Sequence, residues 1–233
     1  MVTRTTLLLA AILALAAGSA LAADGAKVKG PFFGTVHATG TVSYKDGTQK
    51  SWTWDRGRIT ALSASQVTLT RRDRVQVTFA LTSSTAVRND GASYTLADLR
   101  VGLVATVISQ DGNAVVIRRI RGEGAPSGAD QSAFDGPAKG SVTGTIDAQY
   151  SDGTHRAFAY DRGRITEKTD AQITVKRPDG KSVSFAYDAN LLVRDKGEVE
   201  GPDALAVGAG AMFFSQDGKL VLVRCLGRPK QQA

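Results

Sequence analysis

The chain repeats itself, and this constrains its fold more than any other feature. When the sequence is shifted by 106 residues, Gly34 aligns with Gly140 and the match continues to Arg121 without a gap. Roughly a third of the paired positions are identical, and the six residues DRGRIT occur at 55–60 and again at 161–166. A repeat this long is a duplicated small domain rather than one turn of a solenoid. We therefore predict tandem domains at residues 34–122 and 140–228, joined by a Gly-, Ala-, Pro- and Ser-rich linker at 123–139.

Each copy has the residue pattern of β-strands. Apolar and polar residues alternate from Val36 to Tyr44 and again from Val142 to Tyr150, which is typical of a strand with one buried face. An Asp-Gly pair follows each run, and such pairs favour hairpin turns because they tolerate positive φ angles. Only ADLRVG, at 97–102, suggests a helical turn. The fold class is therefore all-β, with two tandem small OB-like β-barrel domains after an N-terminal signal peptide.

The signal peptide is predicted at residues 1–22. Arg4 precedes an apolar run, and Ala20-Leu21-Ala22 has the small-residue form of a cleavage site. The run is shorter than the ~20 residues that cross a bilayer, and no second apolar segment follows, so we expect no membrane span after cleavage. A retained anchor is the alternative. The protein is therefore expected to be secreted or extracytoplasmic, in the periplasm or cell envelope.

Short motifs of the first copy resemble a known bacterial domain. They are a Gly-Arg-Ile-Thr strand start at 57–60, Thr-Ala-Val at 85–87, the ADLRVG turn, and a closing hairpin from Asp111 to Ile120. This combination resembles the bacterial domain of unknown function number 5666. In the second copy Leu191 replaces the threonine, and residues 203–208 have lost the order of the turn. The resemblance implies an OB-like barrel in envelope or secreted proteins, and it carries no catalytic residues.

Candidate catalytic and metal-ligating residues are few. His37 and His155 occupy non-equivalent positions, and no zinc, calcium or nucleophile-elbow motif occurs. Four aspartates recur in both copies, mostly in expected turns, where their side chains satisfy backbone N–H groups: Asp46, Asp55, Asp73 and Asp111, with Asp152, Asp161, Asp179 and Asp217. The single Cys225 excludes an intramolecular disulfide, and its apolar run favours burial over a reactive thiol. We therefore predict no metal, no cofactor and no enzyme activity.

Charge differs between the copies. Residues 34–122 carry twelve Lys and Arg against six Asp and Glu, whereas residues 140–228 carry twelve of each. Arginine suits phosphate, sulfate and carboxylate groups, so the first copy contains candidates for polyanion binding. These are Arg56, Arg58, Arg71, Arg72, Arg74, Arg118, Arg119 and Arg121. Trp52 and Trp54 are candidates for stacking on a ligand, although their alternate spacing fits a core equally well.

The DRGRIT stretch itself is interpreted as a bend. Trp52 and Trp54 share one strand face, but Ile59 falls on the opposite one unless an extra residue is inserted. Glycine is the natural bulge residue, so Gly57 and Gly163 are predicted to be β-bulges. Arg56 and Arg58 would then flank the bend, with Asp55 and Asp161 forming exposed ion pairs of small weight.

The sequence thus predicts an exported, non-catalytic binding or envelope-associated module. One alternative is a protein that binds a polyanion, either anionic polysaccharide or nucleic acid, through the basic first barrel. A second is an enzyme of unidentified type, which would need convergent carboxylates or a shifted titratable group. The expected partner is an anionic envelope polymer or another envelope protein.

Overall fold

The computed structural model describes residues 30–89, 92–119, 140–195 and 198–227. The predicted signal peptide and linker, together with Arg121, lie outside these residues. The described chain is nearly all β, and no helix in it is long and apolar enough to span a membrane. The all-β prediction is therefore confirmed.

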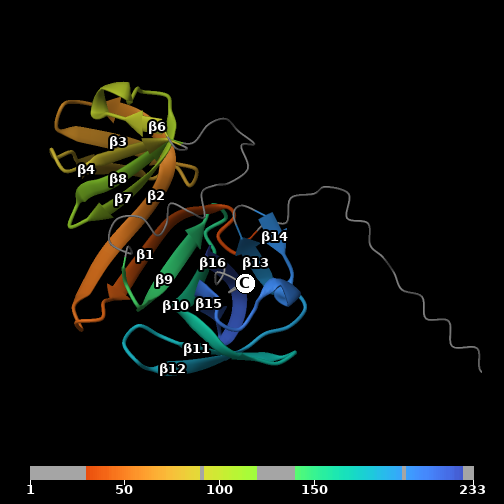
Figure 1. Ribbon diagram of the computed structural model, residues 1–233. Helices are drawn as coiled ribbons and strands as arrows, with labels where there is room; N and C mark the ends of the chain where they lie inside the picture. The colour runs from red at the N-terminus through yellow and green to blue at the C-terminus, as the bar shows by residue number, and fades with distance from the viewer. Residues whose placement is uncertain (1–29, 90–91, 120–139, 196–197, 228–233) are drawn as a thin grey trace, which may run out of the picture.

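The two halves of the chain contain the same elements in the same order (Figure 1). The first half, residues 30–119, contains β1 (Thr35–Ser43), β2 (Gln49–Leu62), β3 (Gln66–Arg71), β4 (Gln76–Ala80), β5 (Ala86–Asn89), β6 (Ala92–Tyr94), the 3-10 turn η1 (Leu96–Asp98), β7 (Val104–Gln110) and β8 (Asn113–Arg119). The second half, residues 140–227, contains β9 (Thr143–Tyr150), β10 (His155–Lys168), β11 (Gln172–Lys176), β12 (Ser182–Ala186), β13 (Leu192–Asp195), β14 (Glu198–Glu200), η3 (Pro202–Ala204), β15 (Gly210–Gln216) and β16 (Lys219–Gly227).

Strand pairing within each half returns to its starting strand. In the first half β2 pairs with β3, β3 with β4, β4 with β8, β8 with β7, and β7 again with β2. β5 and β6 continue outward from β8. The second half repeats these pairings with β10, β11, β12, β16 and β15. Each half thus forms a curved sheet around its own core.

One pair of strands joins the halves into a single 16-stranded sheet. β1 and β9 lie side by side in Figure 1 and pair antiparallel along most of their length. Gly40 pairs with Ile146, its own counterpart in the repeat. A pseudo-twofold axis therefore passes between these two residues and relates the halves.

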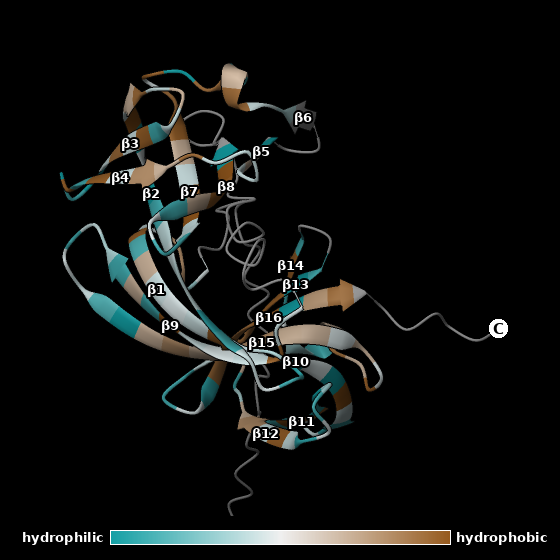
Figure 2. Cartoon of the chain, turned by 90° about the vertical axis from the view of Figure 1, so that its left-hand side faces the viewer, coloured by the Kyte–Doolittle hydropathy of each residue, from teal (hydrophilic) through white to brown (hydrophobic). Residues whose placement is uncertain are grey.

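Three apolar cores stabilise this arrangement. The first half encloses a cluster that includes Ile59, Leu69 and Phe79, and the second half encloses the equivalent cluster, into which the half-buried Cys225 packs. A third cluster lies between the halves, on one face of the joining sheet, and contains Trp52, Trp54, Ile146, Phe158, Tyr160 and Phe214. Burying a large apolar side chain contributes about 1.5–3 kcal/mol. The central core is therefore large enough to fix the two halves against each other. Figure 2 shows the brown apolar bands that alternate with teal and white along these strands.

The prediction of β-bulges at Gly57 and Gly163 is wrong, and so is the reason given for it, a single apolar face along the strand. Gly57 pairs regularly with Arg71 on β3 and with Ala105 on β7. The register of β2 shifts instead between Ile59 and Ala61, with the same shift three residues after Gly163 in β10. Trp54 and Ile59 face opposite ways because β2 contributes one face to the central core and the other to the core of the first half.

Gly57 and Gly163 are required by close packing of backbones. A Cβ atom at Gly57 would lie 2.5 Å from the carbonyl oxygen of Thr70, and one at Gly163 would lie 2.6 Å from that of Lys176. Real Cβ atoms do not approach an oxygen so closely, so a side chain would push β3 or β11 away. The repeated glycine allows β2 and β10 to fold tightly onto the next strand.

Candidate functional site

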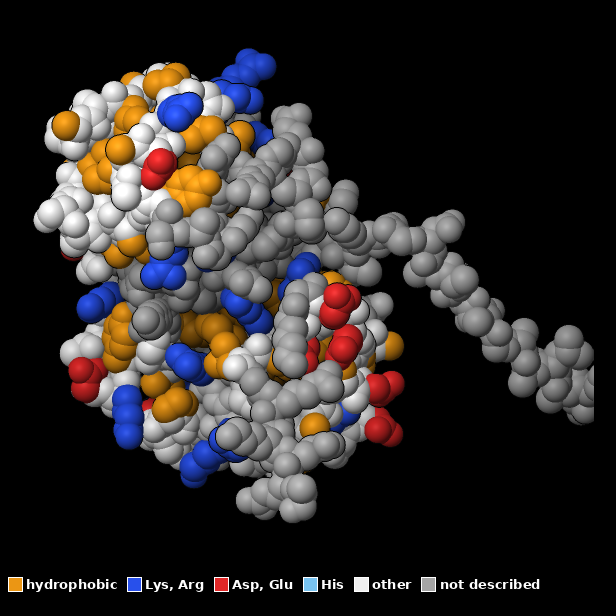
Figure 3. Space-filling view, turned by 45° about the horizontal axis from the view of Figure 1, so that its top comes forward, with side chains coloured by type: hydrophobic (Ala, Val, Ile, Leu, Met, Phe, Trp, Pro, Cys, Tyr) orange, Lys and Arg blue, Asp and Glu red, His pale blue; other side chains and the backbone are white. Residues whose placement is uncertain are grey.

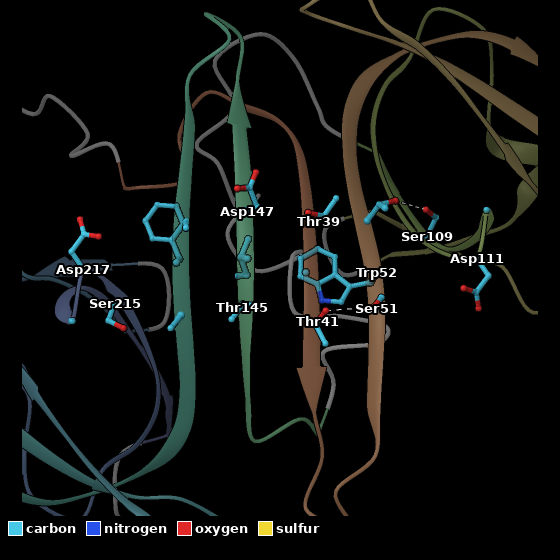
Figure 4. Close-up of a pocket in the computed structure, with 18 residues that line it drawn as sticks. Thr39, Thr41, Ser51, Trp52, Ser109, Asp111, Thr145, Asp147, Ser215 and Asp217 are labelled. Atoms are coloured by element: carbon cyan, nitrogen blue, oxygen red, sulfur yellow. Dashed lines mark hydrogen bonds between the residues drawn. The ribbon is translucent and has the colours of Figure 1, made fainter.

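The sheet that joins the halves has one face of small polar side chains. On β2, β1, β9 and β10 they alternate with the residues of the central core, because successive residues of a strand point to opposite faces. This polar face is hollowed into a trough with a volume of about 700 Å³ (Figure 4). The β7–β8 turn lies at one end of the trough and the β15–β16 turn at the other.

The lining of the trough is shared equally between the halves. Each of its residues from the first half is matched by its own counterpart 106 positions later. The lining residues are Thr39, Gly40, Thr41, Ser51, Trp52, Thr53, Ser109, Asp111 and Gly112, with Thr145, Ile146, Asp147, Ala157, Phe158, Ala159, Ser215, Asp217 and Gly218. The trough therefore lies on the pseudo-twofold axis.

Two rows of side chains cross the floor from one half to the other. The strand registers place in one row Ser109, Thr53, Thr39, Asp147 and Ala157. They place in the other row Ser215, Ala159, Thr145, Thr41 and Ser51. The pseudo-twofold axis exchanges the rows. A ligand that lies across the two rows would therefore contact equivalent side chains at its two ends. Exceptions are the positions where the two copies differ.

Two aspartates lie at the ends of the trough, and their carboxylates have no partner within the described segments. Asp111 and Asp217 open the β7–β8 and β15–β16 turns with φ of 51° each, and neither carboxylate has a hydrogen bond or ion pair among the described residues. The other repeated aspartates are all engaged, as Asp46 is by the backbone N–H and hydroxyl of Thr48. The carboxylates at the ends of the trough therefore remain available to a ligand.

A buried serine at one end has also lost its partner. In the first half the hydroxyls of Ser109 and Thr53 lie 2.5 Å apart. In the second half Ala159 replaces the threonine, so no hydrogen bond engages the Ser215 hydroxyl within the described chain. Ser215 is only 5% exposed and lines the trough beside Asp217 (Figure 4). Its hydroxyl is therefore available to a ligand in the trough.

Among the described residues that line the trough there is no Lys or Arg. The Lys50 ammonium lies 5.5 Å from the centre of the Tyr44 ring, and the Arg156 guanidinium lies 5.0 Å from that of Tyr150. Lys50 and Arg156 belong to β2 and β10, but by alternation they share the face of Trp52 and Phe158 in the central core, opposite to the face of Ser51 and Thr53. The charged groups of the lining are thus all acidic: Asp111, Asp147 and Asp217.

The repeated Asp55 is a buried ion-pair partner, not an exposed one. Its Oδ1 accepts a hydrogen bond from Nη1 of Arg71 at 3.0 Å and lies 2.9 Å from Nδ1 of His37. Arg71 also donates to both carboxylate oxygens of Asp73. Burial alone would lower the pKa of Arg71, but its bonds to Asp73 and Asp55 outweigh this effect and raise it. Arg71 is therefore a structural residue and is withdrawn from the polyanion candidates.

The two arginines of the first DRGRIT have different surroundings. Arg58 donates to the carbonyl oxygen of Gly102 at 2.7 Å and so holds the loop before β7. Arg56 is half-buried near Arg72, and burial followed by that neighbouring charge lowers the pKa of Arg56. Neither Arg56 nor Arg72 has an ion pair among the described residues. These two guanidiniums are the part of the predicted basic set that the structure brings together without a counter-charge.

The remaining arginine candidates are Arg74, Arg118, Arg119 and Arg121. Arg74 is exposed in the β3–β4 turn, and Arg118 lies on β8 opposite Thr106. The structure describes Arg119 only by its backbone in β8, and Arg121 lies outside the described residues. On the face shown in Figure 3, Lys and Arg side chains are scattered over both halves. Arg71 is thus removed from the predicted arginine surface, and the rest of that surface stays a prediction.

The stacking prediction is also corrected. Trp52 and Trp54 are 3% and 6% exposed, and both pack in the central core. Trp52 lies flat over Gly40, where a Cβ atom would come within 2.6 Å of its ring. Although Trp52 borders the trough, too little of either indole is exposed for a base or a sugar to stack on it.

The described residues offer little for catalysis. No three His, Cys, Asp or Glu side chains come together there as a metal site. His37 is paired with the buried Asp55, and the exposed His155 has its Nδ1 2.9 Å from Oδ1 of Asp147. The hydroxyls of the trough can accept and donate hydrogen bonds, and its carboxylates can neutralise a positive charge.

No model of a protein family matches the chain, and no curated protein matches it. The resemblance to the bacterial domain of unknown function number 5666 stays a prediction.

Apart from Trp52, the trough residues were not among the predicted site residues, although the sequence contained a signal for them. Thr39 and Thr41 stand out as polar residues alternating with the core, and Asp111 recurs as Asp217. What the sequence lacked was the pairing of β1 with β9, which brings two polar strand faces from distant segments into one surface.

Proposed function

We propose that this chain is an exported, non-catalytic binding protein made of two tandem OB-like barrels, and that its ligand lies in the trough between them. The observation that carries this proposal is the lining itself, to which both halves contribute equivalent residues around a cavity of about 700 Å³. This volume lies within the range of small-molecule sites, which run from about 300 to 1,000 Å³.

The barrel assignment is supported by the closed pairing in each half. Five strands return to their starting strand, as β2, β3, β4, β8 and β7 do. Five strands in a small closed sheet are what an OB-like barrel requires. Export is supported by the charge, apolar run and small residues of positions 1–22.

The experiment uses a substitution that fills the trough. Thr145 is exposed at the centre of the floor, so Thr145→Trp should place an indole in the cavity without disturbing the core. Panels of oligosaccharides, amines and short peptides are screened by thermal shift against the wild-type chain and this variant. We expect at least one class to stabilise the wild type only, because binding to the native state raises its stability. Stabilisation of both proteins by every active compound would refute the trough as the site.

The matched control is Thr78→Trp. Thr78 is exposed on β4 and does not line the trough. This variant should keep the full response to the same compounds.

A second candidate, anion binding, is favoured by the Arg56 and Arg72 pair. Two adjacent guanidiniums without a carboxylate repel each other, and a phosphate or sulfate group would relieve this repulsion. The second half lacks the pair, because Pro178 stands where the first half has Arg72. The double variant Arg56→Ala/Arg72→Ala should elute from a heparin column at a lower salt concentration than the wild type. The slope of log affinity against log salt concentration should be smaller by about 2. Arg162→Ala is the control, and an equal shift for both variants would rule out the pair as a specific site.

A further inference from the structure

We infer that the ligand of the trough is a linear polyamine, whose terminal ammonium groups are held by Asp111 at one end and Asp217 at the other. This inference rests on the proposed binding function and gives it a chemical class. It comes from the charge, the symmetry and the unsatisfied groups of the lining.

The charge of the lining selects a cation. Within the part of the chain that the structure describes, three carboxylates and no Lys or Arg line the trough, although the whole chain carries a net charge of +7. Of the basic residues on the floor strands, Lys50 and Arg156 lie over tyrosine rings on the other face, and Arg58 and Arg164 donate to loop carbonyl oxygens. Salt screens more distant charges over about 8 Å at physiological ionic strength. A ligand in the trough therefore experiences mainly the negative charge.

Among the described residues, the negative charges of Asp111 and Asp217 stabilise no hydrogen bond or ion pair. Asp73 accepts the N–H of Val75 as well as Arg71, and Asp179 does the same with Lys181 and Arg177. Asp111 has no such bond, nor has Asp217, within the described chain. The positive φ of their turns would suit asparagine equally well. The turn geometry therefore does not require a charge at either end.

The symmetry selects a ligand with similar ends. The pseudo-twofold axis exchanges Asp111 with Asp217, and Figure 4 shows them on opposite sides of the four floor strands. From β7 to β15 there are five strand spacings, or at most about 24 Å along the curved sheet. A long flexible chain with an ammonium at each end matches this layout. The threonine and serine hydroxyls between the ends can accept hydrogen bonds from internal amines.

A serine hydroxyl without a partner among the described residues lies next to one of the end carboxylates. Ser215 is 5% exposed, lines the trough beside Asp217, and lacks the partner that Thr53 gives to Ser109. Its hydroxyl oxygen is an acceptor for an ammonium held by the neighbouring carboxylate. A ligand that reaches Asp217 would therefore also satisfy Ser215.

The test is calorimetric titration of the full exported chain with spermine in dilute salt. Spermine should bind, and it should bind more tightly than the shorter diamine putrescine, which cannot reach both ends. Asp111→Asn and Asp217→Asn should each weaken spermine about five-fold, and the double variant about 25-fold. Asparagine keeps the turn geometry, so folding should be unaffected. Added salt should weaken binding further.

The matched control is the double variant Asp46→Asn/Asp152→Asn. It makes the same change in net charge at equivalent turns outside the trough. It should change spermine affinity less than two-fold. An effect as large as that of the trough pair would overturn the inference, because spermine would then be responding only to overall charge.

Two further outcomes separate this inference from the proposed function. If spermine fails to bind while a neutral oligosaccharide binds and is blocked by Thr145→Trp, the polyamine inference is wrong and the trough remains a binding site. If spermine binds equally well to Thr145→Trp, the inference is also overturned, since the amine would be bound elsewhere. A lysine-rich tetrapeptide, tested beside spermine, distinguishes a free amine from a basic peptide segment.

Discussion

The first half builds its ion-pair cluster from Asp55, Arg71, Asp73 and His37, whereas the second half builds the same cluster without a histidine. In the second half Thr143 replaces His37, and its hydroxyl donates to the carbonyl oxygen of Tyr160 instead. The pair of Arg71 and Asp55 is also more buried than that of Arg177 and Asp161. The arginine and its two aspartates are thus kept in both halves, whereas the histidine is present only in the first.

The central core has diverged in a compensating way. The first half packs the large Trp52 ring over Gly40, and the second half packs the smaller Phe158 opposite Ile146. Gly144, in turn, leaves room for the Tyr160 ring where the first half has Ala38 and Trp54. The halves therefore conserve total volume across a strand pair rather than single side chains. Residues that solve a backbone problem, such as Gly57 and Gly163, have not changed.

The largest expected effect on stability concerns Gly57 and Gly163, and it tests whether both positions require glycine. Gly57→Val and Gly163→Val should each lower the free energy of unfolding by about 3 kcal/mol, because a side chain would collide with the next strand. Gly210→Val is the control, since a Cβ atom there has open space around it. Urea unfolding measures all three. If the two repeated positions differed by more than about 1 kcal/mol, the halves would not be equivalent at this contact.

The ion-pair clusters should show a graded difference. Arg71→Met leaves Asp55 buried without its cation and should cost about 3 kcal/mol, whereas Arg177→Met in the more exposed cluster should cost about 2 kcal/mol. Arg58→Met, which removes only a bond to an exposed loop, should cost less than about 1 kcal/mol. The same unfolding measurement ranks the variants. The reverse order for the two clusters would show that burial does not set their strength.

Acid should weaken both clusters. Burial opposes ionisation of Asp73, but its bonds to Arg71 and the Val75 N–H prevail and lower its pKa, and the bond from Arg177 lowers the pKa of Asp179. A lowered pKa in the folded state gives stability at neutral pH that is lost as pH falls below about 4. Unfolding measured from pH 6 to 3 should show this loss. The Asp73→Asn/Asp179→Asn variant should show less of it.

The strands and turns could be predicted from the sequence because each of them depends on residues that are close together in the chain. Alternation identified the strands, and the Asp-Gly pairs identified turns such as those at Gly47 and Gly153, both with φ of 84°. A helical turn also forms next to this motif, since η1 spans Leu96–Asp98 and so includes the first two residues of ADLRVG. Each of these features requires only a few neighbouring residues to choose a conformation.

The candidate site could not be predicted in the same way, because it depends on pairing between distant strands. Parity placed Trp54 and Ile59 on opposite faces, and the sequence could not reveal that each face has its own core. Arg71 looked like a surface arginine, and only the fold brings it to Asp55, sixteen residues earlier in the chain. Charge counts identified the first half as basic, but they could not separate ion-paired arginines from free ones.

The smallest expected effect concerns the turn between β3 and β4. Arg74 holds a φ of 68° where the second half has Gly180 with a φ of 86°. A side chain disfavours this left-handed conformation, so Arg74→Gly should raise the free energy of unfolding by about 0.5 kcal/mol. Gly180→Arg should lower it by about 1 kcal/mol, and Gly180→Asn should be nearly neutral, because asparagine tolerates positive φ. No gain from Arg74→Gly would mean that the exposed guanidinium makes a favourable interaction that offsets its backbone strain. The arginine-rich turn would then differ from its copy in function as well as in conformation.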